Sequence, residues 1–250
     1  MILELFRGEL PRLVMFDLDG TLVDSVPDLA AAIDRMLAQL GREPAGIERV
    51  RHWVGNGARV LVRRALAGGL EHGAVSDADT ERALELFSEA YAGSHALSRV
   101  YPGVVSTLDW LRGAAVELAL ITNKPERFVA PLLDEMGLGG YFRWIIGGDT
   151  LPQQKPDPAA LLHVLHLAGV APEQALFVGD SRNDVLAAHA AGVPCVALSY
   201  GYNHGRPIAE ENPARVLDDL RQLLPGCAQE GAGVMSPNPS EYPPHETASW

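Results

Sequence analysis

Cysteine is scarce in this chain of 250 residues: Cys195 and Cys227 are the two present, and they do not form a C-x-x-C pair. This composition argues against a cysteine zinc site or a disulfide framework and is typical of a reducing compartment. No apolar stretch approaches the ~20 residues that a membrane span requires. The first seven residues also lack the basic start and the long apolar stretch of a signal peptide. We therefore expect a cytoplasmic protein that does not enter a membrane.

Basic residues are few as well. The chain has 20 Lys and Arg against 32 Asp and Glu, a formal net charge of −12. Nucleic acid is therefore not an expected partner, because its phosphate backbone attracts basic surfaces. No Rossmann fingerprint and no Walker lysine is present, and nothing in the sequence indicates an obligate protein partner.

What the chain does have is a short apolar run at residues 13–16, followed by Asp17-Leu18-Asp19-Gly20-Thr21. Side chains in a strand alternate between its faces, so Asp17 and Asp19 are expected to emerge together where the strand ends. Two like charges that close are unfavourable unless a cation lies between them or one holds a proton. The pair therefore predicts a Mg²⁺-dependent carboxylate site, with a solvated loop as the alternative.

Three later segments extend this pattern. Residues 118–124 and 176–184 are apolar runs that end in Thr-Asn-Lys and in Gly-Asp-Ser-Arg-Asn-Asp, and residues 155–158 are Lys-Pro-Asp-Pro. In open parallel sheets, ligands bind beyond the carboxyl ends of the strands. The ends of three strands and one lysine are thus expected to converge on one site.

The ordered set D-x-D-G-T, T-N, K-P and G-D-x-x-x-D resembles the haloacid dehalogenase superfamily, in its aspartate-nucleophile phosphatase branch. Any one of these motifs alone would be weak, but the full set in this order is highly specific. The resemblance implies an α/β fold with a doubly wound parallel sheet and an inserted helical cap. It also implies a small phosphorylated substrate.

The coarse pattern of the chain agrees with this fold. A first strand near residues 12–17 is followed by a helical block and then, from about residue 100, by alternating helices and strands, which is typical of a parallel doubly wound sheet. We interpret residues 10–24 and 100–225 as the core and residues 25–99 as the cap. Residues 226–250 are rich in proline and glycine without apolar periodicity, and they predict a disordered tail without a catalytic role.

The resemblance also suggests chemical roles. Asp17 is the candidate nucleophile, which forms an aspartyl-phosphate, and Asp19 is the candidate general acid and base. Thr122 and the adjacent Asn123 amide are expected to donate hydrogen bonds to phosphoryl oxygens, and Lys155 to supply a cation to the nucleophile and the phosphoryl group.

Mg²⁺ is the implied cofactor, because it prefers hard oxygen ligands. The resemblance implies the Asp17 carboxylate, the backbone carbonyl of Asp19 and the Asp180 carboxylate as its ligands. Asp184 lies four residues beyond Asp180 and is expected to act from outside, by orienting a metal-bound water, rather than as a direct ligand. Such a cation also offsets the repulsion between an acidic protein and a phosphorylated substrate.

Other functions remain open on the residues alone. A phosphoacceptor receiver domain uses similar groups, but it is a single domain of about 120 residues without a helical insert. A dehalogenase needs no metal and would not use Asp19. A sugar phosphomutase shares all four motifs and differs in its cap, so it is the serious alternative.

Beyond the motifs, residues 54–58 and 200–203 resemble the phosphoglycolate phosphatase subgroup. The implied reaction is hydrolysis of 2-phosphoglycolate to glycolate and phosphate, with another small phosphorylated acid or sugar as the alternative substrate. The turn at Gly55-Asn56-Gly57 precedes a predicted helix, whose free N–H groups suit a carboxylate. We expect Asn56, Gly57 and Arg59 to bind the carboxylate of the substrate there, with an ordinary turn between cap helices as the alternative.

Overall fold

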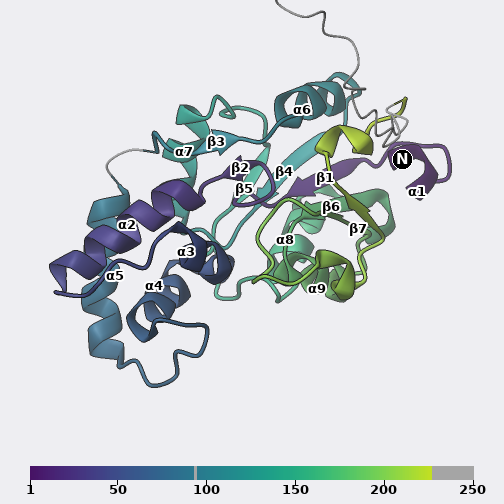
Figure 1. Cartoon of the computed structure of the whole chain (residues 1–250). Coiled ribbons are helices and arrows are strands. Elements are labelled where there is room, and N and C mark those ends of the chain that lie inside the picture. Colours follow the sequence, from purple (N-terminus) through teal and green to yellow (C-terminus); the bar gives the residue numbers. More distant parts are fainter. Residues whose placement is uncertain (93–94, 227–250) are drawn as a thin grey trace, which may run out of the picture.

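The computed structural model describes residues 1–92 and 95–226 of the chain. A sheet of six parallel strands forms the core, in the order β5-β4-β1-β6-β7-β8. The strands are β1 (Leu13–Phe16), β4 (Glu117–Ile121), β5 (Trp144–Ile146), β6 (Ala175–Gly179), β7 (Cys195–Leu198) and β8 (Arg215–Leu217). Figure 1 shows this sheet with helices on its two faces.

The two faces of the sheet are distinguished by the alternation of side chains along each strand. In β1, Val14 and Phe16 pack in one apolar cluster with α6 (Val104–Gly113) and α7 (Val129–Glu135). Leu13 and Met15 pack in a second cluster with α8 (Ala159–Ala168) and α9 (Arg182–Ala191). The central strand is therefore apolar along its whole length, as a strand covered on both faces must be. Short elements complete the core: α1 (Ile2–Leu5), η1 (Glu126–Phe128), η2 (Pro172–Gln174), η3 (Ile208–Glu211) and η4 (Leu220–Leu223).

The strand order reverses direction at β1. The chain continues from β1 to β4 and β5 on one side of it, and then crosses to β6, β7 and β8 on the other side. Loops on the two sides leave a crevice at such a switch point, beyond the carboxyl end of the strand. Asp17 is the first residue after β1 and therefore lies at this crevice.

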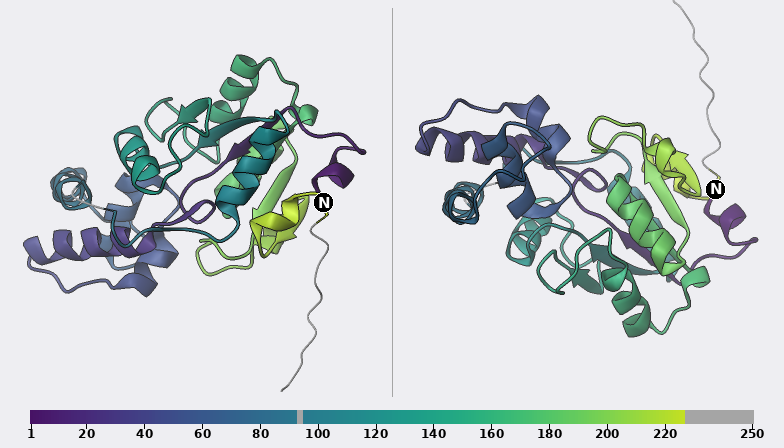
Figure 2. Two further views of the ribbon diagram at one scale, coloured as in Figure 1. Left: turned by 90° about the horizontal axis from the view of Figure 1, so that it is seen from above. Right: turned by 90° about the horizontal axis from the view of Figure 1, so that it is seen from below.

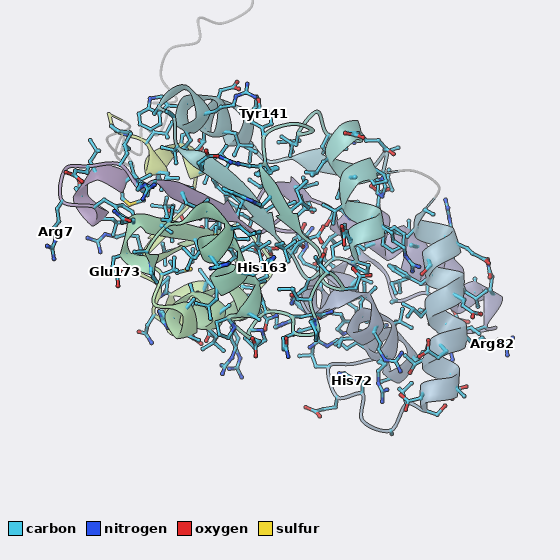
Figure 3. The ribbon with its side chains drawn as sticks, turned by 180° about the vertical axis from the view of Figure 1, so that it is seen from behind. Arg7, His72, Arg82, Tyr141, His163 and Glu173 are labelled. Carbon is cyan, nitrogen blue, oxygen red and sulfur yellow. The ribbon has the colours of Figure 1, made fainter. Side chains whose placement is uncertain are left out.

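Four helices form a separate layer beyond the carboxyl ends of the strands: α2 (Val26–Gln39), α3 (Ile47–Trp53), α4 (Gly57–Ala67) and α5 (Asp77–Tyr91). They share an apolar cluster of their own, which Ile33, Met36 and Phe87 help to form. Figure 2 shows them grouped to one side of the sheet in both views. In Figure 3, His72 and Arg82 mark this end of the molecule, and Arg7 and Glu173 mark the opposite end.

Two linkers join this helical layer to the core and pair with each other. Strand β2 (Val23–Asp24) lies antiparallel to β3 (Arg99–Val100). Beside them, the carboxylate of Asp28 in the first turn of α2 accepts hydrogen bonds from the backbone N–H of Ser98 and from its hydroxyl, both at 2.6 Å. The entry and the exit of the cap are therefore tied together.

The predicted doubly wound parallel sheet is confirmed. The inserted helices α2 to α5 argue against the receiver domain, because a receiver has no such insert. Strands β2, β3 and β8 were not predicted, because two or three residues are too few to show a periodicity. The boundaries of the core and the cap stay a prediction. Residues 227–250 of the predicted tail lie outside the described residues. Within the described chain, no helix is long and apolar enough to cross a membrane.

The linker clamp leads to a prediction about stability. We expect Asp28→Ala to lower the free energy of unfolding by about 1–3 kcal/mol, because the buried polar groups of Ser98 lose their acceptor. Urea titration followed by circular dichroism measures the change. Glu89→Ala, at an exposed position of α5, is the matched control. Equal midpoints for the two variants would contradict the role of the clamp.

Candidate active site

Lys155 lies at the centre of a buried group of charges. Its ammonium is 2.8 Å from Oδ1 of Asp17 and 2.7 Å from Oδ1 of Asp184, and it donates to the backbone carbonyl of Ile121 at 2.7 Å. Lys155 therefore forms ion pairs with two carboxylates and a hydrogen bond to one backbone carbonyl. Burial disfavours the charged lysine, but Asp17 and Asp184 outweigh that effect and hold its pKa above the ordinary value.

Asp184 is fixed by its position at the start of α9. Its Oδ2 atom accepts hydrogen bonds from the backbone N–H of Asp180 and from both the backbone N–H and the hydroxyl of Ser181. With Ser181 it forms a capping box at the first turn of the helix. One oxygen of Asp184 thus accepts hydrogen bonds at the start of the helix, and the other pairs with Lys155. Its position relative to the metal ligands stays a prediction.

Asp180 follows β6, and its side chain lies against the backbone of two glycines, Gly20 and Gly201. It accepts hydrogen bonds from the Thr21 hydroxyl and from the Tyr202 backbone N–H, each at 2.6 Å. A Cβ added to Gly20 or to Gly201 would come within about 2.2 Å of side-chain atoms of Asp180. Both glycines are therefore required for this carboxylate to lie beside Asp17.

The donor set of the site fits a divalent metal ion. One oxygen each of Asp17, Asp180 and Asp184 lie within 4.8 Å of one another. Burial raises the pKa of Asp17 to about 7 and also raises that of Asp180, although Lys155 opposes the shift at Asp17. Among the described residues of this cluster, three carboxylates face one ammonium, and a bound dication would balance the remaining two negative charges. Three hard oxygen donors favour Mg²⁺, Mn²⁺ or Ca²⁺.

Asp19 has different partners from Asp17. The ammonium of Lys124 contacts both of its carboxylate oxygens, at 3.0 and 3.1 Å. The hydroxyl of Ser25 donates to Oδ1 at 2.5 Å. Ser25 occupies the N-cap position of α2 but makes no cap hydrogen bond there. The orientation of Asp19 therefore depends on a residue at the start of the cap.

One cavity lies between the core and the cap. Asp17 and Asp19 line it together, as the strand alternation predicts. The other core residues that line it are Thr122, Asn123, Lys124, Pro125 and Phe128, and the cap contributes Leu29, Val54, Gly55, Gly57, Ala58, Leu61, Phe87 and Tyr91. The carboxylates thus face an apolar roof, which restricts water and strengthens electrostatic interactions.

The cap is attached to the rim of this cavity through one carbonyl group. The backbone oxygen of Gly55 accepts hydrogen bonds from the side-chain amides of Asn123 and Asn183, each at 3.0 Å. Asn123 follows β4 and Asn183 lies in the first turn of α9, so two separate segments of the core bind one cap loop. We call this pair of hydrogen bonds the Gly55 latch.

Comparison with known proteins shows the family of this chain. Residues 11–192 match the model of the haloacid dehalogenase-like hydrolases. The chain belongs to this family.

Within this family, the chain is similar to proteins named as phosphoglycolate phosphatases, among them the following relatives. Phosphoglycolate phosphatase 1 of Pseudomonas aeruginosa is 73% identical over 238 residues, which cover 95% of this chain and 87% of the relative. Phosphoglycolate phosphatase of Pseudomonas putida is 72% identical, with 92% and 85% covered. The crystal structure of a Haemophilus somnus protein, described as a "predicted phosphoglycolate phosphatase", has a TM-score of 0.77 and 39% identity, covering 83% of this chain and 94% of that one.

Within this haloacid dehalogenase-like site, some predicted residues have other roles. The Asn123 side chain binds Gly55 and also the backbone N–H and carbonyl of Lys155, so it positions the lysine loop and the cap. Thr122 lines the cavity, and its hydroxyl accepts from the Lys124 backbone N–H at 3.2 Å. Lys155 has the expected contact with the nucleophile, but its donors are directed to protein acceptors.

Of the three cap residues expected to bind the substrate, one lines the cavity and two do not. Gly57 lines the cavity, close to the backbone carbonyl of Asn123. Arg59 does not line it: its guanidinium pairs with Asp77 and Glu81 on the exposed side of α4, so the expectation that it contacts the substrate is corrected. Asn56 is not among the lining residues either, and its buried Oδ1 atom has no hydrogen-bond partner in the described chain.

Sequence reasoning missed Lys124, Ser25 and Asn183. Lys124 follows Thr122-Asn123 directly, and a cation at that strand end was a usable signal. Ser25 is only six residues from its partner Asp19, but a serine before a helix is more readily read as an N-cap. Asn183 gave no signal, because its partner is the backbone of Gly55, 128 residues away.

The Gly55 latch leads to a prediction about local opening. We expect Asn183→Ala to speed amide exchange of residues 50–57 by roughly 2- to 12-fold, the effect of losing one hydrogen bond. Hydrogen–deuterium exchange with mass spectrometry measures this. Gln153→Ala removes an exposed amide and is the control. Exchange rates that match in the two variants would mean that the latch does not hold the cap.

Proposed function

We propose that this chain hydrolyses 2-phosphoglycolate to glycolate and phosphate, through an aspartyl-phosphate on Asp17. The observation that carries the proposal is the pair of carboxylates in one cavity with different cationic partners, Lys155 for Asp17 and Lys124 for Asp19. The two aspartates can therefore take different roles in one reaction. The names and the high identity of the relatives support this substrate.

In the first step, a carboxylate oxygen of Asp17 attacks phosphorus and the ester P–O bond breaks. Lys155 holds Asp17 toward the crevice, and protonated Asp19 gives its proton to the departing glycolate oxygen. In the second step, Asp19 takes a proton from a water molecule, which attacks the phosphorus of the aspartyl-phosphate. The P–O bond to Asp17 breaks, and phosphate leaves.

Asp17 and Asp180 would hold Mg²⁺, together with the backbone carbonyl of Asp19, while Asp184 orients their surroundings. When bound there, Mg²⁺ neutralises charge on the phosphoryl oxygens and so reduces their repulsion of the nucleophile. The Gly20 and Gly201 backbone leaves Asp180 the space to take part.

The cap side of the cavity suits a small anionic group. Gly57 and Ala58 begin α4 and line the cavity, and the first N–H groups of a helix have no partners within it. These N–H groups are the donors that we propose for the substrate carboxylate, in place of Arg59. The adjoining apolar residues leave the carboxylate no competing polar group on the cap.

The covalent mechanism predicts unequal effects at the two aspartates. We expect Asp17→Asn to abolish phosphate release, because the nucleophile is lost. Asp19→Asn should still bind substrate and lose about 10²–10⁴-fold in turnover, the usual contribution of general acid–base catalysis. Phosphate release from 2-phosphoglycolate is measured, with the exposed Asp134→Asn as control. Near-normal activity of Asp17→Asn would exclude the aspartyl-phosphate.

The metal assignment predicts that excess EDTA abolishes activity and that added Mg²⁺ restores it. Asp180→Asn should need a higher Mg²⁺ concentration for half-maximal activity, because a ligand loses its charge. Calorimetric titration with Mg²⁺ gives a second measurement, independent of turnover. Full activity after chelation would remove the metal from the mechanism.

A further inference from the structure

Lys124 is a buried cation that pairs with Asp19, and the proposed mechanism gives it no contact with the substrate. Its side chain is 3% exposed, yet it lines the cavity. The ammonium contacts both oxygens of Asp19 and lies 4.8 Å from the centre of the Tyr91 ring. The ammonium of Lys124 therefore lies directly beside the candidate general acid.

Lys124 differs from Lys155 in where it can act. Lys155 is surrounded by Asp17, Asp184 and a backbone carbonyl, and it does not line the cavity. Among the described residues that line the cavity, Lys124 is the one with a positive charge. Lys124 is therefore the cation available in this cavity to an anionic group of the substrate other than its phosphate.

The chemistry of the substrate places an anionic group at that point. In 2-phosphoglycolate, one CH₂ group separates the carboxylate from the ester oxygen that Asp19 protonates. The substrate carboxylate must therefore lie close to Asp19. Once Asp19 has given up its proton, the two carboxylates repel each other unless a cation lies between them. Lys124 already contacts both oxygens of Asp19 and is in position to be that cation.

The opposite wall completes the subsite. Gly57, at the start of α4, is so close to the core that an added Cβ would be 3.1 Å from the backbone carbonyl of Asn123, the residue before Lys124. The N-terminus of α4 and the Lys124 loop therefore face each other across a narrow gap. A helix N-terminus and an ammonium both favour a carboxylate.

We propose that Lys124 binds the carboxylate of the substrate while it holds Asp19, and that it sets the preference for phosphate esters of small hydroxy acids. The proposal rests on the proposed function. It makes Lys124 a specificity-determining residue, which couples recognition of the leaving group to the acid that protonates it.

The first test compares two substrates in wild type and Lys124→Gln. 2-Phosphoglycolate has a carboxylate, and 2-hydroxyethyl phosphate has an uncharged hydroxymethyl group in the same position. We expect kcat/KM of the variant to fall roughly 10- to 100-fold further on phosphoglycolate than on hydroxyethyl phosphate, the effect of one lost charge-assisted contact. Lys124→Arg, which keeps the charge, should retain most of the preference. An equal fall on both substrates would overturn the proposal, because a residue that only positions Asp19 affects both alike.

The second test avoids the unpaired Asp19 carboxylate that Lys124→Gln alone would leave, because Asp19 is replaced by asparagine in both variants. Asp19→Asn and the double variant Asp19→Asn with Lys124→Gln differ only in the lysine. Calorimetry should show weaker binding of phosphoglycolate to the double variant, by at least about 10-fold, with little change for hydroxyethyl phosphate. Equal affinities of the two variants for phosphoglycolate would overturn the role of Lys124.

The wild-type enzyme separates the two proposals. If it has no preference for phosphoglycolate over hydroxyethyl phosphate, the proposed function fails, and recognition of a carboxylate fails with it. If it has the preference and Lys124→Gln keeps it, the assignment of Lys124 alone is wrong.

Discussion

The site depends on one ammonium group held among carboxylates. Lys155 joins Asp17 to Asp184 and anchors both to the backbone of Ile121 at the end of β4. Without that charge, the buried carboxylates that follow β1 and β6 would repel one another and take up protons. Even with it, burial raises the pKa of Asp17 to about 7. The unbalanced negative charge explains why this arrangement favours a divalent cation. Gly20 and Gly201 are needed beside Asp180 for a steric reason, because a Cβ at either position would collide with its side chain.

A second ion pair connects the chemistry to the cap. Asp19 is held by Lys124 from the core and by Ser25 from the start of α2, while Gly55 of the cap binds two core amides. Asp19 and the roof of the cavity are therefore both oriented by contacts between the core and the cap.

What could be predicted from the sequence depends on whether a residue is recognised from its neighbours in the chain or from contacts with distant segments. The fold and the positions of Asp17, Asp19 and Asp180 could be predicted, because these carboxylates follow apolar strands and parallel strands end at one edge. Lys155 could be placed there through the order of the motifs. Arg59 was misjudged: a cation one turn into a helix can face either the cavity or solvent, and Asp77 and Glu81 on the next helix decide which. Lys124 was overlooked in its role, because its partner Asp19 lies 105 residues away.

The sequence by itself determined the reaction class and the central sheet, since alternation of apolar side chains and the order of the strand-end motifs are local properties of the chain. Only the tertiary structure decided which lysine pairs with which aspartate, and that Asn123 binds both the cap and the loop of Lys155. It also decided that, among the described residues, Lys124 is the cation that lines the cavity. The physical reason is that electrostatic and hydrogen-bond partners are set by distances between segments that the chain brings together only when the sheet and the cap have packed.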